Sequence, residues 1–182
     1  MKRKGTQMIH LYTGEGKGKT TAAIGLCIRA AGRNFHVCFS QFMKGNDTGE
    51  LSILKNIPNV TIFRSEKNFA FYHEMSQKDK EELTNIHNSI LDKLLEQVKN
   101  RTCQMIIMDE ITYPIHWGLL DKEKLNRLFQ LQKEGVKEEL ELVLTGRDPA
   151  DFLMNAADYI TYMSCIRHPF QKGIAARKGI EF

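Results

Sequence analysis

Short apolar runs recur along the chain, and longer stretches with apolar residues at helical spacing separate them. The runs are rich in branched and aromatic residues, which is typical of buried strands in a parallel sheet. They cover residues 8–12, 35–41, 60–63, 105–108, 141–144 and 159–163. Alternation of such runs with helical patterns predicts an α/β fold of three layers, in which helices flank a mostly parallel sheet.

Three helices are predicted, over residues 19–31, 76–100 and 122–133, because apolar residues there lie three and four positions apart. Gly32 ends the first helix, and Ser76 can cap the second. Residues 44–74 are predicted to be the long irregular stretch of the chain. Long loops in compact domains are usually functional.

Composition limits the classes of protein that fit. The length of 182 residues suits one domain over residues 1–182. The net charge of +4 is spread along the chain, so no nucleic-acid partner is expected. No apolar run approaches the length of a membrane span, so no membrane partner is expected.

The four cysteines, Cys27, Cys38, Cys103 and Cys165, form no CxxC pair and lie in apolar or helical contexts. We expect buried, reduced thiols and therefore a reducing, cytoplasmic compartment. The six histidines have neither HxxxH nor HExxH spacing, so no zinc site is expected.

A glycine-rich segment, TGEGKGKTT at residues 13–21, follows an apolar run and precedes a predicted helix. This is the structural context of a phosphate-binding P-loop, and it favours a three-layer P-loop (RecA-like) fold. Glycines let successive backbone N–H groups surround phosphate oxygens at the positive end of a helix. The predicted triphosphate-binding residues are Gly14, Glu15, Gly16, Lys17, Gly18, Lys19, Thr20 and Thr21.

Within this loop, Lys19 supplies a full positive charge, and Thr20 can place its hydroxyl on a magnesium ion. The general GxxxxGK pattern has glycine where this chain has Thr13. A glycine turn that binds nothing is the alternative, and the packing of two lysines with three glycines argues against it.

An acidic pair, Asp109 and Glu110, follows the apolar run at residues 105–108. Carboxylates at the carboxyl edge of a parallel sheet, beside a P-loop, can hold magnesium directly or through water. Ordinary strand-end acids are the alternative, but the upstream P-loop favours the metal. Thr20, Asp109 and Glu110 are therefore the predicted magnesium ligands.

The residues that would perform a reaction are less obvious. No Ser-His-Asp or Cys-His arrangement is present, and no further carboxylate is indicated as a base. Either ATP is hydrolysed, or the substrate brings its own nucleophile. A RecA-like P-loop ATPase, a nucleoside kinase and a non-catalytic sensor all fit these features.

Motifs along almost the whole chain decide between these classes. They are TGEGKGKTTAAIGLCIRAAG, QFMKG, MDEITY, LTGR and RHPFQKGIAARKGIEF. In these motifs the chain resembles the ATP:corrinoid adenosyltransferases of cobalamin biosynthesis and salvage, whose P-loop begins with threonine, so Thr13 is then expected. The resemblance implies transfer of the 5′-deoxyadenosyl group of ATP to the cobalt(I) of cobalamin or cobyrinic acid a,c-diamide, with release of triphosphate.

The resemblance also implies roles for single residues. Lys19, Thr20 and Glu110 are the implied catalytic residues, which stabilise charge on the departing triphosphate. Arg29 and Arg147 are implied to bind the nucleotide, although solvated surface arginines are the alternative at both positions.

Two phenylalanines, Phe69 and Phe71, match a family segment that lies against the lower face of the corrin. Apolar bulk there excludes water and the lower axial ligand, which eases reduction of cobalt(II). Without the resemblance, both rings would be interpreted as anchors of a loop.

The implied substrates are ATP and a reduced corrinoid, with Mg²⁺ as cofactor. A flavin-type electron donor protein and a second copy of the chain, in a homodimer, are the implied macromolecular partners. Products distinguish the alternatives, because an ATPase or kinase cleaves the γ-phosphate and an adenosyltransferase leaves the triphosphate intact.

Overall fold

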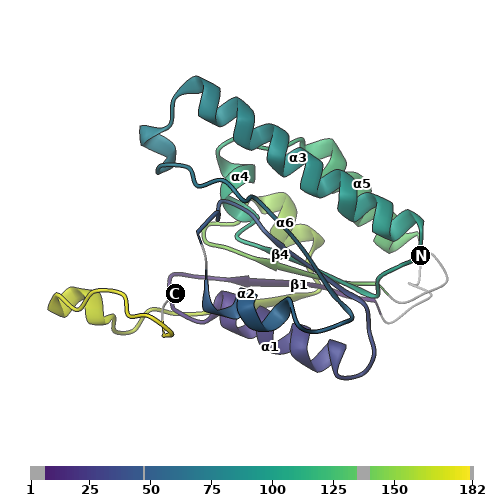
Figure 1. The fold of residues 1–182 in the computed structure, drawn as a ribbon, viewed down its shortest axis with the longest axis horizontal. Helices are drawn as coiled ribbons and strands as arrows, with labels where there is room; N and C mark the ends of the chain where they lie inside the picture. Colours follow the sequence, from purple (N-terminus) through teal and green to yellow (C-terminus); the bar gives the residue numbers. More distant parts are fainter. Residues whose placement is uncertain (1–6, 47, 135–139, 181–182) are drawn as a thin grey trace.

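The computed structural model describes residues 7–46, 48–134 and 140–180. In this part of the chain, six strands form one sheet in which all paired strands are parallel (Figure 1). They are β1 (Ile9–Thr13), β2 (Val37–Gln41), β3 (Val60–Arg64), β4 (Met105–Asp109), β5 (Glu141–Thr145) and β6 (Tyr159–Tyr162). The order across the sheet is β3-β2-β4-β5-β1-β6, so β5 lies between β1 and β4.

The register brings the carboxyl ends of the central strands to one edge of the sheet. Tyr12 of β1 pairs with Thr145 of β5, and Met108 of β4 pairs with Leu144 of β5. Residues that follow these strands therefore lie close together. This edge is where open α/β sheets bind ligands.

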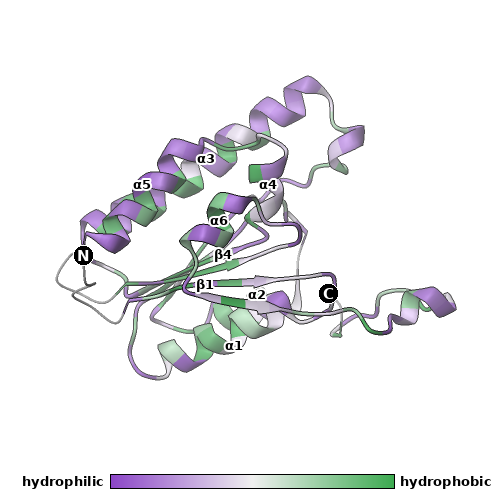
Figure 2. Ribbon diagram, turned by 180° about the vertical axis from the view of Figure 1, so that it is seen from behind, coloured by the Kyte–Doolittle hydropathy of each residue, from purple (hydrophilic) through white to green (hydrophobic). Residues whose placement is uncertain are grey.

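Helices cover both faces of the sheet (Figure 1, and Figure 2 from behind). The helices over one face are α3 (Gln77–Lys99), α4 (Thr112–His116), α5 (Lys122–Lys133) and α6 (Asp151–Ala156). The opposite face carries α1 (Lys19–Ala31) and α2 (Gly49–Leu54). None of the described helices combines the length and apolarity needed to cross a membrane.

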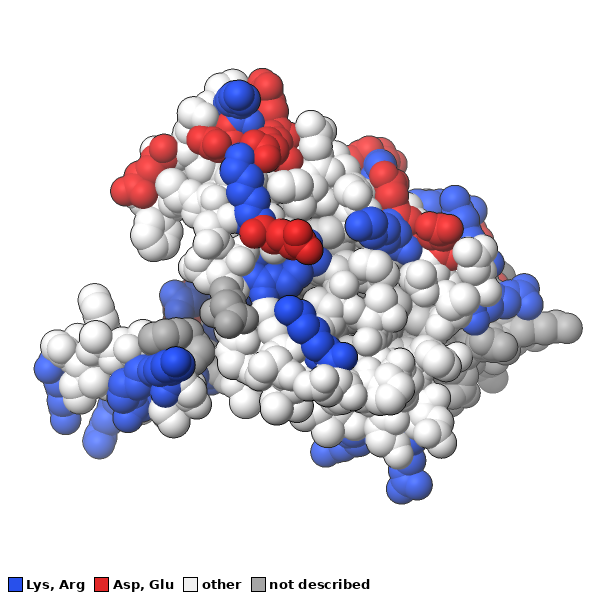
Figure 3. Space-filling model, in the orientation of Figure 1, with Lys and Arg blue, Asp and Glu red and all other residues white. Residues whose placement is uncertain are grey.

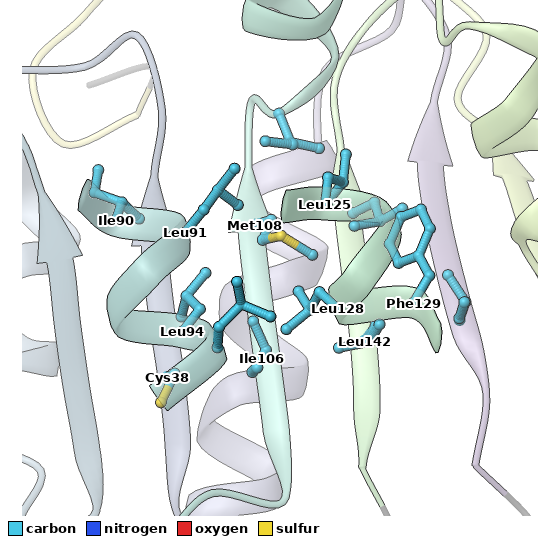
Figure 4. Packing of buried hydrophobic residues seen from close by; sticks show 14 of the residues in the cluster. Cys38, Ile90, Leu91, Leu94, Ile106, Met108, Leu125, Leu128, Phe129 and Leu142 are labelled. Atoms are coloured by element: carbon cyan, nitrogen blue, oxygen red, sulfur yellow. The ribbon is translucent and has the colours of Figure 1, made fainter. Parts of the chain in front are cut away.

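The two faces of β4 pack in two separate cores because successive side chains of a strand point to opposite faces. Ile106 and Met108 pack with Leu94 of α3 and Leu128 of α5 (Figure 4). Ile107, between them, packs on the other face with the cluster that includes α1. All five residues of β4 are buried, so the strand that leads to the acidic pair is a fixed part of the core.

The long helix α3 begins at a capping box. The Ser76 Oγ accepts a hydrogen bond from the Asp79 backbone N–H at 3.1 Å, and Asp79 Oδ2 accepts one from the Ser76 backbone N–H at 3.3 Å. Such a pair satisfies two backbone donors that the first turn of a helix leaves unpaired.

The sequence predictions of the three-layer parallel fold, the six strands and the three long helices are confirmed, and α1 and α5 have the predicted bounds. Helices α2, α4 and α6 were not predicted, because five or six residues are too few to show a helical period. The prediction of one long irregular stretch over residues 44–74 was wrong. Besides β3, which the apolar run at residues 60–63 predicted, it contains α2 and the 3-10 helix η1 (Tyr72–Glu74).

Two predictions of burial were also wrong. Strand β6, at one edge of the sheet, is exposed along its whole length, and Tyr162 is 66% exposed. Cys165 is exposed, whereas the other three cysteines are buried thiols.

Residues 164–180, which we call the C-terminal arm, extend away from the sheet and turn back toward it (Figure 1, yellow). The arm contains the 3-10 helix η2 (Pro169–Lys172). It carries exposed Ile166, Phe170 and Ile174. Lysine and arginine side chains stand out on it in Figure 3, and its sequence has no acidic residue.

Candidate active site

The glycine-rich loop connects β1 to α1 and rests on the chain that follows β6. The Gly16 backbone N–H donates to the Met163 carbonyl at 2.7 Å. A Cβ on Gly14 would lie 2.5 Å from the same carbonyl oxygen, and Gly14 has a φ of 99°. Glycine is therefore required at position 14 by both the contact and the backbone conformation.

Lys19 begins α1 and points back into the loop. Its Nζ donates to the carbonyls of Gly14 at 2.6 Å and Gly16 at 2.8 Å, and the side chain is buried. Burial lowers the pKa of Lys19, and the nearby Arg147 charge lowers it further. A buried ammonium at a helix N-terminus attracts an anion strongly.

Asp109, fully buried at the end of β4, joins three elements around the loop. Its Oδ1 accepts hydrogen bonds from the hydroxyls of Thr20 at 2.8 Å and Thr145 at 2.7 Å. Its Oδ2 forms an ion pair with Lys44 Nζ at 2.8 Å. The carboxylate therefore links the first turn of α1, the end of β5 and the loop after β2.

Glu110 follows in a left-handed conformation with a φ of 61°, and its backbone N–H donates to Thr145 Oγ1 at 2.9 Å. Burial raises the pKa of Glu110, and the adjacent Asp109 raises it further, while Lys44, Lys19 and Arg147 lower it. A carboxyl held among three cations suits a role near a bound polyanion or its metal ion.

Arg147, in the turn after β5, reaches the glycine-rich loop. Its Nη1 lies 2.9 Å from Glu15 Oε2. Gly146 before it has a φ of 148°, and a Cβ there would overlap the side chain of Thr112 in α4. The turn therefore packs tightly on α4 and directs Arg147 toward the loop.

The donors near the loop fit magnesium. Thr20 offers a hydroxyl, and Asp109 and Glu110 offer carboxylates, which are the oxygen ligands that Mg²⁺ prefers when phosphates and water complete its shell. The part of the chain that the structure describes has no cluster of three or more His, Cys, Asp or Glu residues able to hold a metal alone. These residues therefore suit an ion that arrives with a phosphate ligand.

A cavity of about 770 Å³ opens beside the loop, within the range of small-molecule sites. Lys17 of the loop and Thr20 and Ile24 of α1 line it. Residues 43–46, 48–50, 65 and 67–69 also line it, together with residues 179 and 180 at the end of the C-terminal arm. The cavity is thus lined both by the glycine-rich loop and by Phe69.

Comparison with known proteins decides among the P-loop classes. The sequence profile of the ATP:corrinoid adenosyltransferase BtuR/CobO/CobP family matches residues 5–182. The chain belongs to this family. As an ATP:corrinoid adenosyltransferase, it is an enzyme that transfers an adenosyl group to a corrinoid in cobalamin biosynthesis, as the resemblance of its motifs implied.

Curated relatives agree over nearly the whole chain. A corrinoid adenosyltransferase of Sinorhizobium is 29% identical over 178 residues, covering 96% of this chain and 80% of the relative. That of Pseudomonas aeruginosa is 28% identical over 181 residues, covering 98% and 84%. That of Escherichia coli K12 is 27% identical over 176 residues, covering 96% and 85%.

Among solved structures, the KaiC-like protein PH0186 of Pyrococcus horikoshii is similar in fold, with a TM-score of 0.53 and 14% identity. The similarity covers 87% of this chain and 71% of the neighbour. At this identity it shows the fold alone, and it agrees with the predicted RecA-like arrangement.

The structure brings most predicted site residues of this adenosyltransferase together. Thr20 and Asp109 are hydrogen-bonded, and Lys19 and Arg147 lie at the same loop. Arg29 lies apart from them, exposed in the last turn of α1, about 15 Å along the helix axis from Lys19.

The two predicted corrin-contacting rings have different surroundings. Phe69 lines the cavity and packs against the buried residues Met75, Leu83 and Leu119. Phe71 is 75% exposed and stacks on His73, with ring centroids 6.0 Å apart. Only Phe69 lies in the wall of the cavity.

Sequence reasoning missed Lys44, Thr145 and His87. Lys44 and Thr145 lie in the motifs QFMKG and LTGR, but no role was derived for them from the sequence. His87 lies in no motif, and one histidine on the apolar face of a helix carries no sequence signal.

Proposed function

We propose that the cavity binds ATP and a cobalt(I) corrinoid together, with the triphosphate in the glycine loop and the corrin against Phe69. The observation that carries this proposal is that one cavity is lined both by Thr20 and Lys44, which contact Asp109, and by Phe69. A site for adenosyl transfer needs both a polyanion pocket and an apolar surface for the corrin.

In the proposed reaction, the electron pair of cobalt(I) attacks C5′ of the ribose. A cobalt–carbon bond forms, the C5′–O bond breaks, and its electron pair leaves on the triphosphate, while cobalt becomes formally cobalt(III). No protein nucleophile or base is required. The protein contributes orientation of the two substrates and stabilisation of the leaving group.

The leaving triphosphate gains negative charge as the C5′–O bond breaks. We propose that Lys19, the N–H groups of the loop and Arg147 bind that charge, because Lys19 Nζ lies within the loop and Arg147 contacts Glu15 of the loop. Because Lys19 is buried, its interaction with the triphosphate is less screened by water.

We propose that Thr20, Asp109 and Glu110 hold Mg²⁺ at the triphosphate, directly or through water. When bound, the ion would neutralise phosphate charge. Asp109 orients the Thr20 hydroxyl, and Glu110 supplies the more solvent-accessible carboxylate.

The corrinoid must reach the site as cobalt(I), which needs one electron added to cobalt(II). We propose that a flavin-type protein supplies this electron. Phe69 lies in the apolar part of the cavity wall, and Phe71 is exposed nearby in the chain, so both rings are available to exclude water from the lower face of a corrin.

We also propose a homodimer of single-domain chains that span residues 1–182. Exposed apolar side chains gather on the edge strand β6, with Tyr159 and Tyr162, and on the C-terminal arm, with Phe170. Apolar surface of this kind marks contact sites, and an edge strand invites pairing. Phe170→Asp should then convert a dimer to a monomer in sedimentation velocity, and a wild-type monomer would contradict the proposal.

The proposed compartment is the cytoplasm. Cys27, Cys38 and Cys103 are buried as free thiols, and the cobalt(I) substrate persists only under reducing conditions.

Anaerobic incubation with MgATP and chemically reduced cob(I)alamin tests the reaction. Adenosylcobalamin, followed by its light-sensitive spectrum, and inorganic triphosphate should form in equal amounts. Lys19→Ala should abolish both products, and the matched control Lys99→Ala, at an exposed position in the last turn of α3, should retain them. Phosphate release without a cobalt–carbon product would favour the ATPase alternative.

A further inference from the structure

A buried histidine of α3 lies behind the cavity and outside every motif. His87 is 1% exposed, and Leu83, one helical turn before it, lines the cavity. Phe42 packs beside its ring, with centroids 5.3 Å apart. The ring is therefore enclosed next to the site but does not line it.

Both ring nitrogens of His87 bond to backbone atoms of separate loops. Nδ1 lies 2.9 Å from the Leu119 carbonyl oxygen, and Nε2 lies 3.3 Å from the Met43 backbone nitrogen. Because a carbonyl only accepts, Nδ1 carries the proton, and Nε2 of the neutral ring accepts from the Met43 N–H.

The hydrogen bond from the Met43 N–H to His87 fixes the backbone position of Lys44, the next residue. Met43 has a φ of 58°, a left-handed conformation that is unfavourable for a residue with a side chain. The preceding Phe42 is tied to the end of β4 by a 2.9 Å bond from its N–H to the Asp109 carbonyl. The following Lys44 reaches the Asp109 carboxylate. The bond from His87 thus holds the turn that directs Lys44 over the phosphate site.

The Leu119 bond holds the apolar wall. Leu119 is buried with Met75 and Leu83, and Phe69 packs on the same cluster. Trp117, two residues earlier, stacks on Tyr72 with centroids 4.6 Å apart. This loop therefore supports the part of the cavity that contains Phe69.

We propose that His87 is a positioning residue that fixes Lys44 at the phosphate side and the Leu119 loop at the apolar side. This inference rests on the proposed binding of MgATP and corrinoid in the cavity. A neutral imidazole suits the task because it is a rigid ring with a donor and an acceptor on opposite sides. An aliphatic residue would leave a buried N–H and a buried carbonyl unpaired.

Two variants separate the two bonds. In His87→Asn the side-chain amide can replace Nδ1 and donate to Leu119, but the acceptor for Met43 is lost. In His87→Gln the side-chain carbonyl can replace Nε2 and accept from Met43, but the bond to Leu119 is lost. His36→Gln, at an exposed histidine before β2, is the matched control.

Calorimetric titration of each variant with MgATP is the first measurement. His87→Asn should weaken MgATP binding between about two- and tenfold, the value of one hydrogen bond, and His87→Gln should change it less than about twofold. For the corrinoid we expect the opposite ranking of the two variants: KM should rise more in His87→Gln than in His87→Asn. Both variants losing only thermal stability, with unchanged affinities, would overturn the proposal.

A double-mutant cycle tests whether His87 acts through Lys44. In a Lys44→Ala background, His87→Asn should no longer weaken MgATP binding. An equal loss in both backgrounds would overturn the coupling. If the wild-type protein itself failed to bind MgATP, the proposed function would fail instead.

Discussion

Lys44 Nζ contacts Asp109 Oδ2 at 2.8 Å, although 65 positions separate the two residues in the chain. The contact forms because β2 and β4 are neighbours in the sheet, with Gln41 opposite Asp109. The loop after β2 therefore starts beside the acidic end of β4. A lysine placed there can balance the carboxylate and also meet a polyanion in the cavity.

Lys44→Ala should destabilise the protein by about 1–3 kcal/mol, because the buried Asp109 loses its only ion-pair partner among the described residues. Chemical denaturation measures the change. Lys124→Ala is the matched control, since the Lys124–Asp92 pair is at the surface and should cost about 0–1 kcal/mol. Equal losses in the two variants would show that the Asp109 pair is no stronger than a surface pair.

Thr145→Val should destabilise the protein by about 1–3 kcal/mol, because Thr145 Oγ1 both donates to Asp109 and accepts from the Glu110 N–H. Thr145→Ser keeps the hydroxyl and should recover most of the loss. Thr61→Val, at an exposed position of β3, should be nearly neutral in urea unfolding. Failure of the serine variant to recover stability would point to packing of the methyl group instead.

Gly14→Ala should abolish triphosphate binding and lower the melting temperature, because its Cβ would collide with Met163 and its φ is positive. Gly25→Ala, where a Cβ meets no atom within 4 Å in the middle of α1, should instead stabilise by about 0.5–1 kcal/mol. Thermal unfolding and triphosphate titration distinguish the two. Normal triphosphate binding by Gly14→Ala would contradict the described loop geometry.

His87 should make stability fall on acidification. Burial lowers its pKa from 6.5 to about 4, so protonation favours the unfolded state. The stabilisation of the folded state by neutral His87 is complete above about pH 6.5 and is lost as the pH falls toward 4. The free energy of unfolding falls by about 3 kcal/mol over this range, at 1.36 kcal/mol per pKa unit. Comparing wild type with His87→Gln isolates this term, and parallel pH profiles between pH 7 and 4 would contradict it.

Local features of the chain were readable from the sequence. The glycine loop was predicted because its glycines, Lys19 and Thr20 are consecutive, and α3 was predicted because Ser76 caps a long apolar period. The acidic pair was found because it directly follows an apolar strand. In each case neighbouring residues carry the signal, so no knowledge of distant contacts was needed.

The sequence by itself therefore determined the fold class, the family and the position of the glycine-rich loop. Only the tertiary structure decided the order of the strands, which seats Gly14 and Gly16 on Met163 and places Lys44 on Asp109. It also decided that β6 is an exposed edge and that His87 joins two loops. The physical reason is that local patterns fix backbone conformation, whereas these contacts depend on which strands pair across the sheet.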